Sequence, residues 1–184
     1  MFVYIISRYY FNDKRMFSTI DHLTGAVGVR LQRVALTLLG KPDLTFLDQN
    51  LAIGGHCNIK KLWKNNIQAI LDLREENQDS PQELEKYSMQ YLRLPISDSS
   101  TPTLENALNA IQWIKSRLDD NRKVFVHCNL GRGRAPLLAC TYLISQGIDK
   151  ENALRIVQKK RKYTYLNKKQ LNWINEFHNT IFKS

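Results

Sequence analysis

Residues 127 to 134 combine a nucleophile, an anion cradle and a cation within one short stretch. The apolar run Val124–Val126 predicts a strand ending at His127-Cys128, and apolar residues after the loop predict a helix. Backbone N–H groups of a glycine-containing loop that opens a helix can bind a tetrahedral oxyanion. The same dipoles stabilise a thiolate, so Cys128 could act as a nucleophile.

The rest of the loop completes a predicted phosphate site. The Arg134 guanidinium could bind two phosphate oxygens in bidentate fashion. The residues expected to bind phosphate beside it are Asn129, Leu130, Gly131, Arg132 and Gly133. The plainer alternative is a buried structural cysteine beside a glycine-rich turn. We favour the site, because a strand, His-Cys, five residues, Arg and a helix form a demanding pattern.

The pattern His127-Cys128-x-x-Gly131-x-x-Arg134 resembles the signature loop of the cysteine-dependent protein tyrosine phosphatase superfamily, specifically its dual-specificity branch. The resemblance covers roughly Leu47 to Phe177. It implies that Cys128 takes the phosphoryl group, that an upstream aspartate protonates the leaving oxygen, and that water then hydrolyses the phosphocysteine. It also implies that the ring of His127 bonds backbone near the loop and supports the thiolate, and that no cofactor is needed.

Ala135 departs from this resemblance. The family usually has Ser or Thr directly after the arginine, and its hydroxyl assists breakdown of the phosphocysteine. Arg134-Ala135-Pro136 resembles the phosphatases of regenerating liver, which carry the same substitution and turn over slowly. The resemblance therefore implies slow hydrolysis of the intermediate. A slow or inactive phosphate-binding module remains the competing hypothesis.

Asp98 is the candidate general acid. It follows the predicted strand Tyr91–Ile96 and precedes a predicted helix, the setting in which the family places its acid loop. The chemistry needs a protonated carboxyl on a loop that can close over substrate. The alternative is that Asp98 only shapes a turn. Asp72 is a poorer candidate, because it lies inside a strand that reads as buried on both faces.

Strands alternating with helices indicate an α/β domain with a central, largely parallel sheet flanked by helices, protein-tyrosine-phosphatase-like. We place this catalytic domain at residues 43–184, after an N-terminal extension of residues 1–42. The expected strands are Leu47–Ile53, Ile67–Arg74, Tyr91–Ile96 and the run before Cys128. The expected helices are Leu62–Asn66, one capped by Thr101, Pro136–Gln146, one capped by Asp149, and one around Leu171–Ile181. Glu75–Glu83 is expected to be a loop, and Asn167–Gln170 to correspond to the relatives' polar loop near the active site.

The N-terminal extension contains a helical pattern over Asp21–Leu39. Its apolar stripe consists of Leu23, Val27, Leu31, Val34 and Leu38. Such a basic amphipathic helix could lie on an anionic membrane, but we favour packing of the stripe against the domain. Met1–Ile20 is too short and too charged for a confident signal peptide, and we favour an extra strand or an arm.

The chain has 184 residues and a net charge of +10, which favours an anionic partner. Phosphotyrosine proteins, with phosphoserine and phosphothreonine as an extension, are the first expected substrates. Phosphoinositides or other phospholipid headgroups are the second, since lipid-phosphate relatives often carry basic loop residues such as Arg132. Nucleic acid is unlikely, being suggested only by charge. The basic run Lys159–Lys162 could be a solvated face or could steer an anionic substrate.

Three cysteines in a chain of this length fit a reducing compartment and no disulfide scaffold. This favours a cytoplasmic location, at most peripheral to a membrane, and no apolar run is long enough to span one. The scattered histidines His22, His56 and His178 show no metal-ligand spacing, so no metal site is expected. Cys57 or Cys140 pairing with the nucleophile is kept as a weak redox hypothesis.

Overall fold

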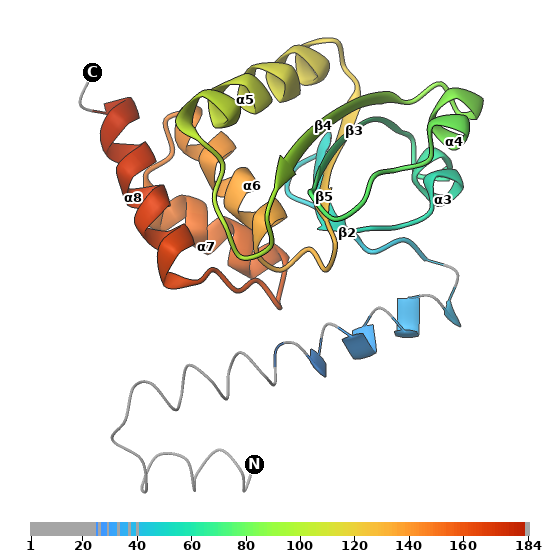
Figure 1. Ribbon diagram of the computed structural model, residues 1–184, viewed down its shortest axis with the longest axis horizontal. Helices are drawn as coiled ribbons and strands as arrows, with labels where there is room; N and C mark the ends of the chain where they lie inside the picture. The colour runs from blue at the N-terminus through green and yellow to red at the C-terminus, as the bar shows by residue number, and fades with distance from the viewer. Residues whose placement is uncertain are drawn as a thin grey trace, which may run out of the picture.

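Five strands form one sheet at the centre of the domain (Figure 1). The structure, a computed structural model, describes residues 25, 27–28, 30–32, 34–36, 38–39 and 41–182. The order across the sheet is β1-β2-β5-β3-β4, and the strands are β1 (Leu44–Phe46), β2 (Leu51–Gly55), β3 (Ile67–Arg74), β4 (Gln90–Ile96) and β5 (Lys123–Cys128). Only β1 pairs antiparallel among these described strands. The predicted α/β fold with a largely parallel sheet is confirmed.

Helices cover both faces of the sheet (Figure 1). The described helices are α3 (Ile59–Lys64), α4 (Pro81–Lys86), α5 (Leu104–Asp119), α6 (Arg134–Ser145), α7 (Lys150–Lys160) and α8 (Lys168–Phe182). α3 and α4 lie on one side, and α5 to α8 lie on the other. A parallel sheet needs this cover, because its strands are apolar on both faces.

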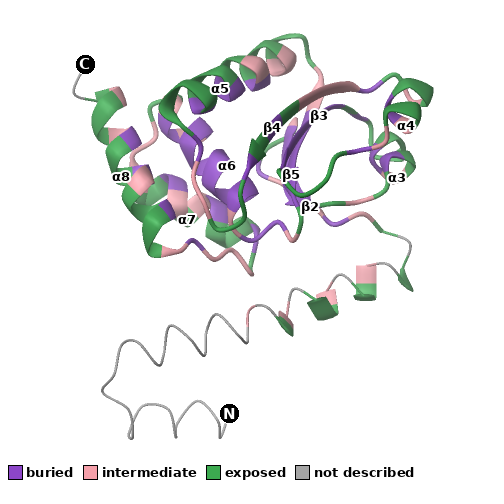
Figure 2. Cartoon of the chain, viewed as in Figure 1, coloured by how far each residue is buried: buried purple, intermediate pink, exposed green. Residues whose placement is uncertain are grey.

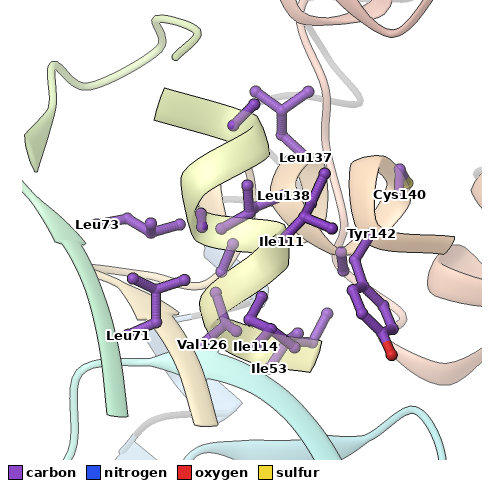
Figure 3. Close-up of a cluster of buried hydrophobic side chains, with 14 of the residues drawn as sticks. Ile53, Leu71, Leu73, Ile111, Ile114, Val126, Leu137, Leu138, Cys140 and Tyr142 are labelled. Carbon is purple, nitrogen blue, oxygen red and sulfur yellow. The ribbon is translucent and has the colours of Figure 1, made fainter. Parts of the chain in front are cut away.

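Alternate side chains of the central strands enter two separate cores. Leu71 and Val126 point toward α5 and α6 (Figure 3), whereas Ile70 and Phe125 pack with α3 and α4. The strands β2, β3 and β5 and the helix α6 are mostly buried (Figure 2). This rigid centre fixes the carboxyl end of β5, where the signature loop begins.

Several predicted ends of strands and helices are wrong by a few residues. The predicted strand Leu47–Ile53 is interrupted, because the Asp48 carboxylate accepts hydrogen bonds from the backbone of Asn50 and Leu51 and forms a turn. The strand therefore starts at Leu51. Thr103, not Thr101, caps α5, and its hydroxyl accepts the Asn106 N–H.

Two short helices also differ from expectation. The predicted loop Glu75–Glu83 already contains the start of α4, which Ser80 caps and Pro81 opens. Asn58 caps α3, so this helix begins before the predicted Leu62. By contrast, Asp149 caps α7 as predicted, and β3 has the predicted bounds. Local capping chemistry sets these ends, and a neighbouring cap residue shifts each helix by a few positions.

The described residues between 25 and 38 are helical, but they do not pack as predicted. Val27, Leu31, Val34 and Leu38 of the apolar stripe are 55%, 65%, 57% and 83% exposed. The helix turns its small residues to the domain instead: a Cβ on Gly28 would lie 2.6 Å from the Tyr163 ring. The expectation that this stripe packs on its own domain is therefore wrong for these members.

Met1–Ile20 and two members of the helical pattern, Asp21 and Leu23, lie outside the described residues. Within the described part of the chain, no helix has the length and apolar character needed to cross a membrane.

Candidate active site

The signature loop connects the carboxyl end of β5 to the start of α6. Cys128 is the last residue of β5, which lies between β2 and β3, and Arg134 is the first residue of α6. The Cys128 side chain is buried. Gly131 has a φ of +65°, a left-handed conformation that glycine adopts without strain and that turns the loop back on itself. The loop thus ends with its N–H groups at the beginning of a helix.

The carbonyl groups of this loop are held on its outer side. Donors outside the loop reach the carbonyl oxygens of Asn129, Leu130, Gly131 and Arg132. These donors are the backbone N–H of His56, the Arg161 guanidinium, which reaches both Leu130 and Gly131, and the backbone N–H of Tyr165. These bonds hold the carbonyl oxygens of residues 129–132 from outside the loop. A loop held in this way at the start of a helix is suited to bind an anion with its backbone N–H groups.

Arg161 is the main support under the loop. Its Nη2 lies 3.2 Å from the Leu130 carbonyl oxygen and 3.1 Å from each carboxylate oxygen of Asp43. Both side chains are 6% exposed. Arg161 belongs to the basic run Lys159–Lys162, for which a solvated or steering role was expected; for this residue that expectation is wrong. Asp43 also accepts the Gly55 N–H, which ties the loop support to β2.

Arg134 is buried and fixed on its outer side. Its Nη1 and Nη2 atoms bind the two Glu76 carboxylate oxygens at 2.7 and 2.8 Å. Nη1 also donates to the carbonyl of Ile96 at 2.9 Å. Its Nε, also buried, has no hydrogen-bond partner within the described chain. The guanidinium is therefore oriented by Glu76, and its Nε is left to donate to an oxyanion.

The hydrogen bond from Arg134 lowers the pKa of the Glu76 carboxyl to about 2, so Glu76 is ionised at neutral pH. Glu76 was not identified from the sequence. It lies in the polar run after β3, where nothing local distinguishes it from Glu75, and only the three-dimensional approach of Arg134 selects it.

Asp98 lies at the mouth of the site. Its Oδ1 is 3.3 Å from Arg134 Nη2, and its side chain is 82% exposed. The acid loop is tied to the segment before α8: Asn167 Nδ2 donates to the Ser99 carbonyl at 2.7 Å. Gln170 Nε2 donates to the Ser100 carbonyl at 3.1 Å. The region Asn167–Gln170 thus lies beside the acid loop, with Gln170 in the first turn of α8.

His127 lies beneath the loop in a buried cluster of charged groups. Its Nε2 is 3.1 Å from the Asp79 carboxylate, and its Nδ1 is 3.3 Å from the Cys128 carbonyl oxygen. Arg74 Nη2 contacts the carboxylates of both Asp72 and Asp79, at 2.7 and 2.6 Å. One side-chain oxygen or nitrogen from each of Asp72, Asp79 and His127 lies within 4.8 Å of the others, a spacing that a metal ion could bridge. The Arg74 guanidinium already supplies a cation to both carboxylates of this group.

The structure therefore brings Cys128, Arg134 and Asp98 to one place and puts Asp72 in the support below them. Cys57 and Cys140 are free thiols, and burial raises the pKa of each to about 12. Both thiols are therefore protonated at neutral pH. Redox pairing with the nucleophile stays a hypothesis.

Comparisons with known proteins place this geometry in context. A family model described as "Polymorphic toxin system, DSP-PTPase phosphatase" matches residues 46–148, more than half of the chain. The human "Phosphatidylglycerophosphatase and protein-tyrosine phosphatase 1" is 30% identical over 123 residues, covering 63% of this chain and 61% of the relative. The "PRL-1 phosphatase" of Drosophila melanogaster is 29% identical over 121 residues, or 65% of this chain and 68% of the relative.

Solved structures show the same architecture. The structure described as Tk-PTP in the active form has a TM-score of 0.70 and 28% sequence identity, covering 75% of this chain and 97% of its own. PTPMT1 in complex with PI(5)P has a TM-score of 0.71 at 23% identity, with 77% of this chain and 98% of that chain covered. Because the identity to PTPMT1 is only 23%, this similarity concerns the fold alone.

Proposed function

Because this chain belongs to the DSP-PTPase phosphatase family, we propose that it hydrolyses phosphate monoesters through a phosphocysteine intermediate. Cys128 is the nucleophile, Arg134 and the backbone of residues 129–133 bind the phosphoryl group, and Asp98 is the acid–base residue. The observation that carries the proposal is the signature loop itself. Its carbonyls are held outward, its cysteine is buried at the base, and a preset arginine has its Nε available.

In the first half-reaction the Cys128 thiolate attacks phosphorus. The S–P bond forms as the bond from phosphorus to the ester oxygen breaks, and Asp98 donates its proton to that leaving oxygen. The loop N–H groups and Arg134 stabilise the three non-bridging oxygens, on which charge is spread in the transition state. The position of Asp98 beside Arg134 supports this division of roles.

In the second half-reaction water attacks phosphorus and transfers a proton to the Asp98 carboxylate. The S–P bond breaks, the thiolate is restored, and inorganic phosphate leaves. Ala135 is fully buried at the start of α6 and offers no hydroxyl to assist this step. The second half-reaction is therefore the slow one in this proposal.

Phosphotyrosine proteins are the proposed substrate class, with phosphoserine and phosphothreonine proteins as an extension. Phospholipid phosphates are the second candidate, favoured by two observations. The human relative is named for both a lipid phosphatase and a protein-tyrosine phosphatase activity. Arg132 is a basic residue inside the loop; its Nε donates to the Tyr163 carbonyl, and its guanidinium lies 5.5 Å from the centre of the Tyr165 ring.

A peripheral contact with an anionic membrane belongs to the same proposal. The exposed stripe residues Val27, Leu31, Val34 and Leu38 face away from the domain, and Arg30 is also exposed. Apolar side chains flanked by cations suit the interface of an anionic bilayer. Sedimentation with anionic and neutral vesicles, comparing the full chain with Leu31→Ser/Leu38→Ser, tests this contact. Equal binding of the two proteins would count against it.

The proposed activity is tested by phosphate release in chelator and reductant. The substrates are a phosphotyrosine peptide and a phosphoinositide, and the proteins are wild type, Cys128→Ser and Asp98→Ala. Multiple turnover that Cys128→Ser abolishes and Asp98→Ala slows supports the phosphatase and selects its substrate class. Tight phosphate binding without turnover on either substrate would instead indicate a phosphate-binding module.

A further inference from the structure

The buried cluster beneath Cys128 carries a charge arrangement that the proposed catalytic roles do not include. We propose that Asp79 is a positioning residue that keeps His127 as an imidazolium cation behind Cys128 and thereby favours the thiolate. Asp79 lies on the loop between β3 and α4, far from Cys128 in sequence. It acts through His127 and does not touch the substrate.

The hydrogen bonds of His127 determine its charge. Nδ1 faces the carbonyl oxygen of Cys128 at 3.3 Å, and a carbonyl can only accept. Nε2 faces the Asp79 carboxylate at 3.1 Å, which is also an acceptor while ionised. A neutral imidazole has one N–H and would leave one of these contacts as a repulsion between two acceptors. Both contacts are satisfied only when both nitrogens carry a hydrogen.

The charge balance of the cluster agrees with this assignment. Asp72 and Asp79 are both buried, and Arg74 Nη2 binds both of their carboxylates. One guanidinium between two carboxylates leaves a net charge of −1, which is costly inside a protein. An imidazolium at His127 restores neutrality.

The other neighbours of His127 do not supply a competing charge. The titratable and charged groups around the imidazole are Asp72, Arg74, Asp79, Tyr91, His56 and Cys128. The Tyr91 hydroxyl donates to Asp72 at 3.0 Å, and burial together with the Asp72 charge raises the pKa of the phenol, so it stays neutral. Burial and the Arg74 charge lower the pKa of His56. Phe125 stacks on the His127 ring at 5.3 Å and keeps it in this orientation.

The consequence concerns the nucleophile. His127 precedes Cys128 in the chain, its Nδ1 lies 3.3 Å from the Cys128 carbonyl oxygen, and both side chains are buried. A fixed cation here adds to the loop dipoles that favour S⁻ over SH. Without the Asp79 carboxylate, the imidazolium loses its counter-ion and the neutral ring becomes favoured.

The test measures the thiol directly. The rate of Cys128 alkylation by iodoacetamide is followed against pH for wild type, Asp79→Asn and Tyr91→Phe, with peptide mapping to confirm the site. We expect Asp79→Asn to raise the midpoint of the pH profile by about one unit. Tyr91→Phe removes two hydrogen bonds from the same cluster, one donated to the Asp72 carboxylate and one accepted from the Asp79 backbone N–H. It leaves both His127 acceptors, so its midpoint is expected to stay unchanged. An unchanged midpoint in folded Asp79→Asn, or an equal shift in both variants, would overturn the proposal.

A second measurement covers the case in which Asp79→Asn does not fold. Nitrogen-15 NMR of wild-type His127 near neutral pH reports directly whether both ring nitrogens are protonated. A neutral His127 would overturn the proposal. The inference rests on Cys128 being the nucleophile of the proposed function, but neither measurement uses substrate. A chain without phosphatase turnover that still shows the shift would refute the function and leave this inference standing.

Discussion

Asp98 Oδ1 lies 3.3 Å from Nη2 of Arg134, so the candidate general acid and the candidate phosphate clamp meet at the mouth of the loop. Arg134 is buried and held by Glu76, whereas Asp98 is largely exposed and depends on its loop for position. The hydrogen bond from Asn167 to the Ser99 carbonyl fixes that loop. The acid is therefore positioned by the segment that precedes α8.

The substitution Asn167→Ser should remove the hydrogen bond to the Ser99 carbonyl while keeping the cap of α8. A serine hydroxyl can still accept the Gln170 N–H, as Asn167 Oδ1 does at 2.9 Å, but it cannot reach Ser99. We expect kcat for a phosphotyrosine peptide to fall by roughly three- to tenfold, because the acid is less often in place. The activated ester p-nitrophenyl phosphate, which needs less help from an acid, should be affected less. Asn172→Ala, an exposed change on the same helix, is the control. Equal losses on both substrates would contradict a role in acid positioning.

Ala135→Ser should accelerate breakdown of the phosphocysteine. The added hydroxyl sits at the start of α6, next to Arg134, where the resemblance places a group that assists the second step. We expect steady-state turnover to rise by about three- to tenfold and the pre-steady-state burst to shrink. Rapid-quench kinetics with p-nitrophenyl phosphate measures both. Absence of a burst in wild type, or an unchanged steady-state rate in Ala135→Ser, would contradict this account of the second step.

Glu76→Gln should weaken phosphate binding, although Glu76 is not proposed to touch phosphate. The carboxylate binds both terminal nitrogens of Arg134, and a neutral amide can accept from only one of them. Arg134 then loses its fixed orientation, and we expect the inhibition constant of orthovanadate to rise by about three- to tenfold. Glu75→Gln is the matched control, since Glu75 is exposed one residue away. Unchanged inhibition in Glu76→Gln would show that the loop alone orients the arginine.

The same carboxylate gives stability a defined pH dependence. Arg134 lowers the pKa of Glu76 from 4.5 to about 2 in the folded protein. A carboxyl with a depressed pKa contributes stability above its unfolded pKa and loses it as pH falls through the folded pKa. The difference in free energy of unfolding between wild type and Glu76→Gln should therefore be constant from about pH 8 to 5 and shrink between 4.5 and about 2. Urea denaturation across this range measures it. A difference that grows on acidification would contradict the ion pair.

Asp43→Asn should damage both stability and phosphate binding. It leaves the buried Arg161 guanidinium without its counter-ion, a change that typically costs about 3–5 kcal/mol. Arg161 then holds the Leu130 and Gly131 carbonyls less firmly, so orthovanadate binding should weaken as well. Lys160→Ala, exposed in the same basic run, should change neither. Denaturant titration and vanadate inhibition distinguish the outcomes. A stable, tightly binding Asp43→Asn would show that the loop needs no support from Arg161.

The parts of the fold that follow from local pattern could be predicted from sequence. The apolar run Ile67–Arg74 has no polar face and forms the predicted buried strand. The signature loop is recognisable because its glycines, thiol and guanidinium lie within a few residues, so their chemistry is local. The position of Asp98 follows from the same family pattern, and the structure brings it to Arg134.

The supports of the site were missed because they depend on distant partners. Arg161 looks like its basic neighbours until the fold places Asp43 against it. Asp79 looks like a cap or turn residue until His127 lies 3.1 Å away. The helical stripe that includes Leu31 shows periodicity but not direction, and Gly28 on another side of the helix approaches Tyr163. Periodicity identifies an apolar face, whereas only tertiary packing decides where that face points.

The central claim is that Cys128 carries the phosphoryl group during the reaction. Wild-type protein mixed with excess phosphotyrosine peptide, quenched in acid within the burst and mapped by mass spectrometry, tests it directly. We expect a phosphoryl adduct on Cys128, absent from Cys128→Ser and less abundant in Ala135→Ser because the second step is faster. Release of phosphate without any adduct on Cys128, or release that persists in Cys128→Ser, would contradict the mechanism.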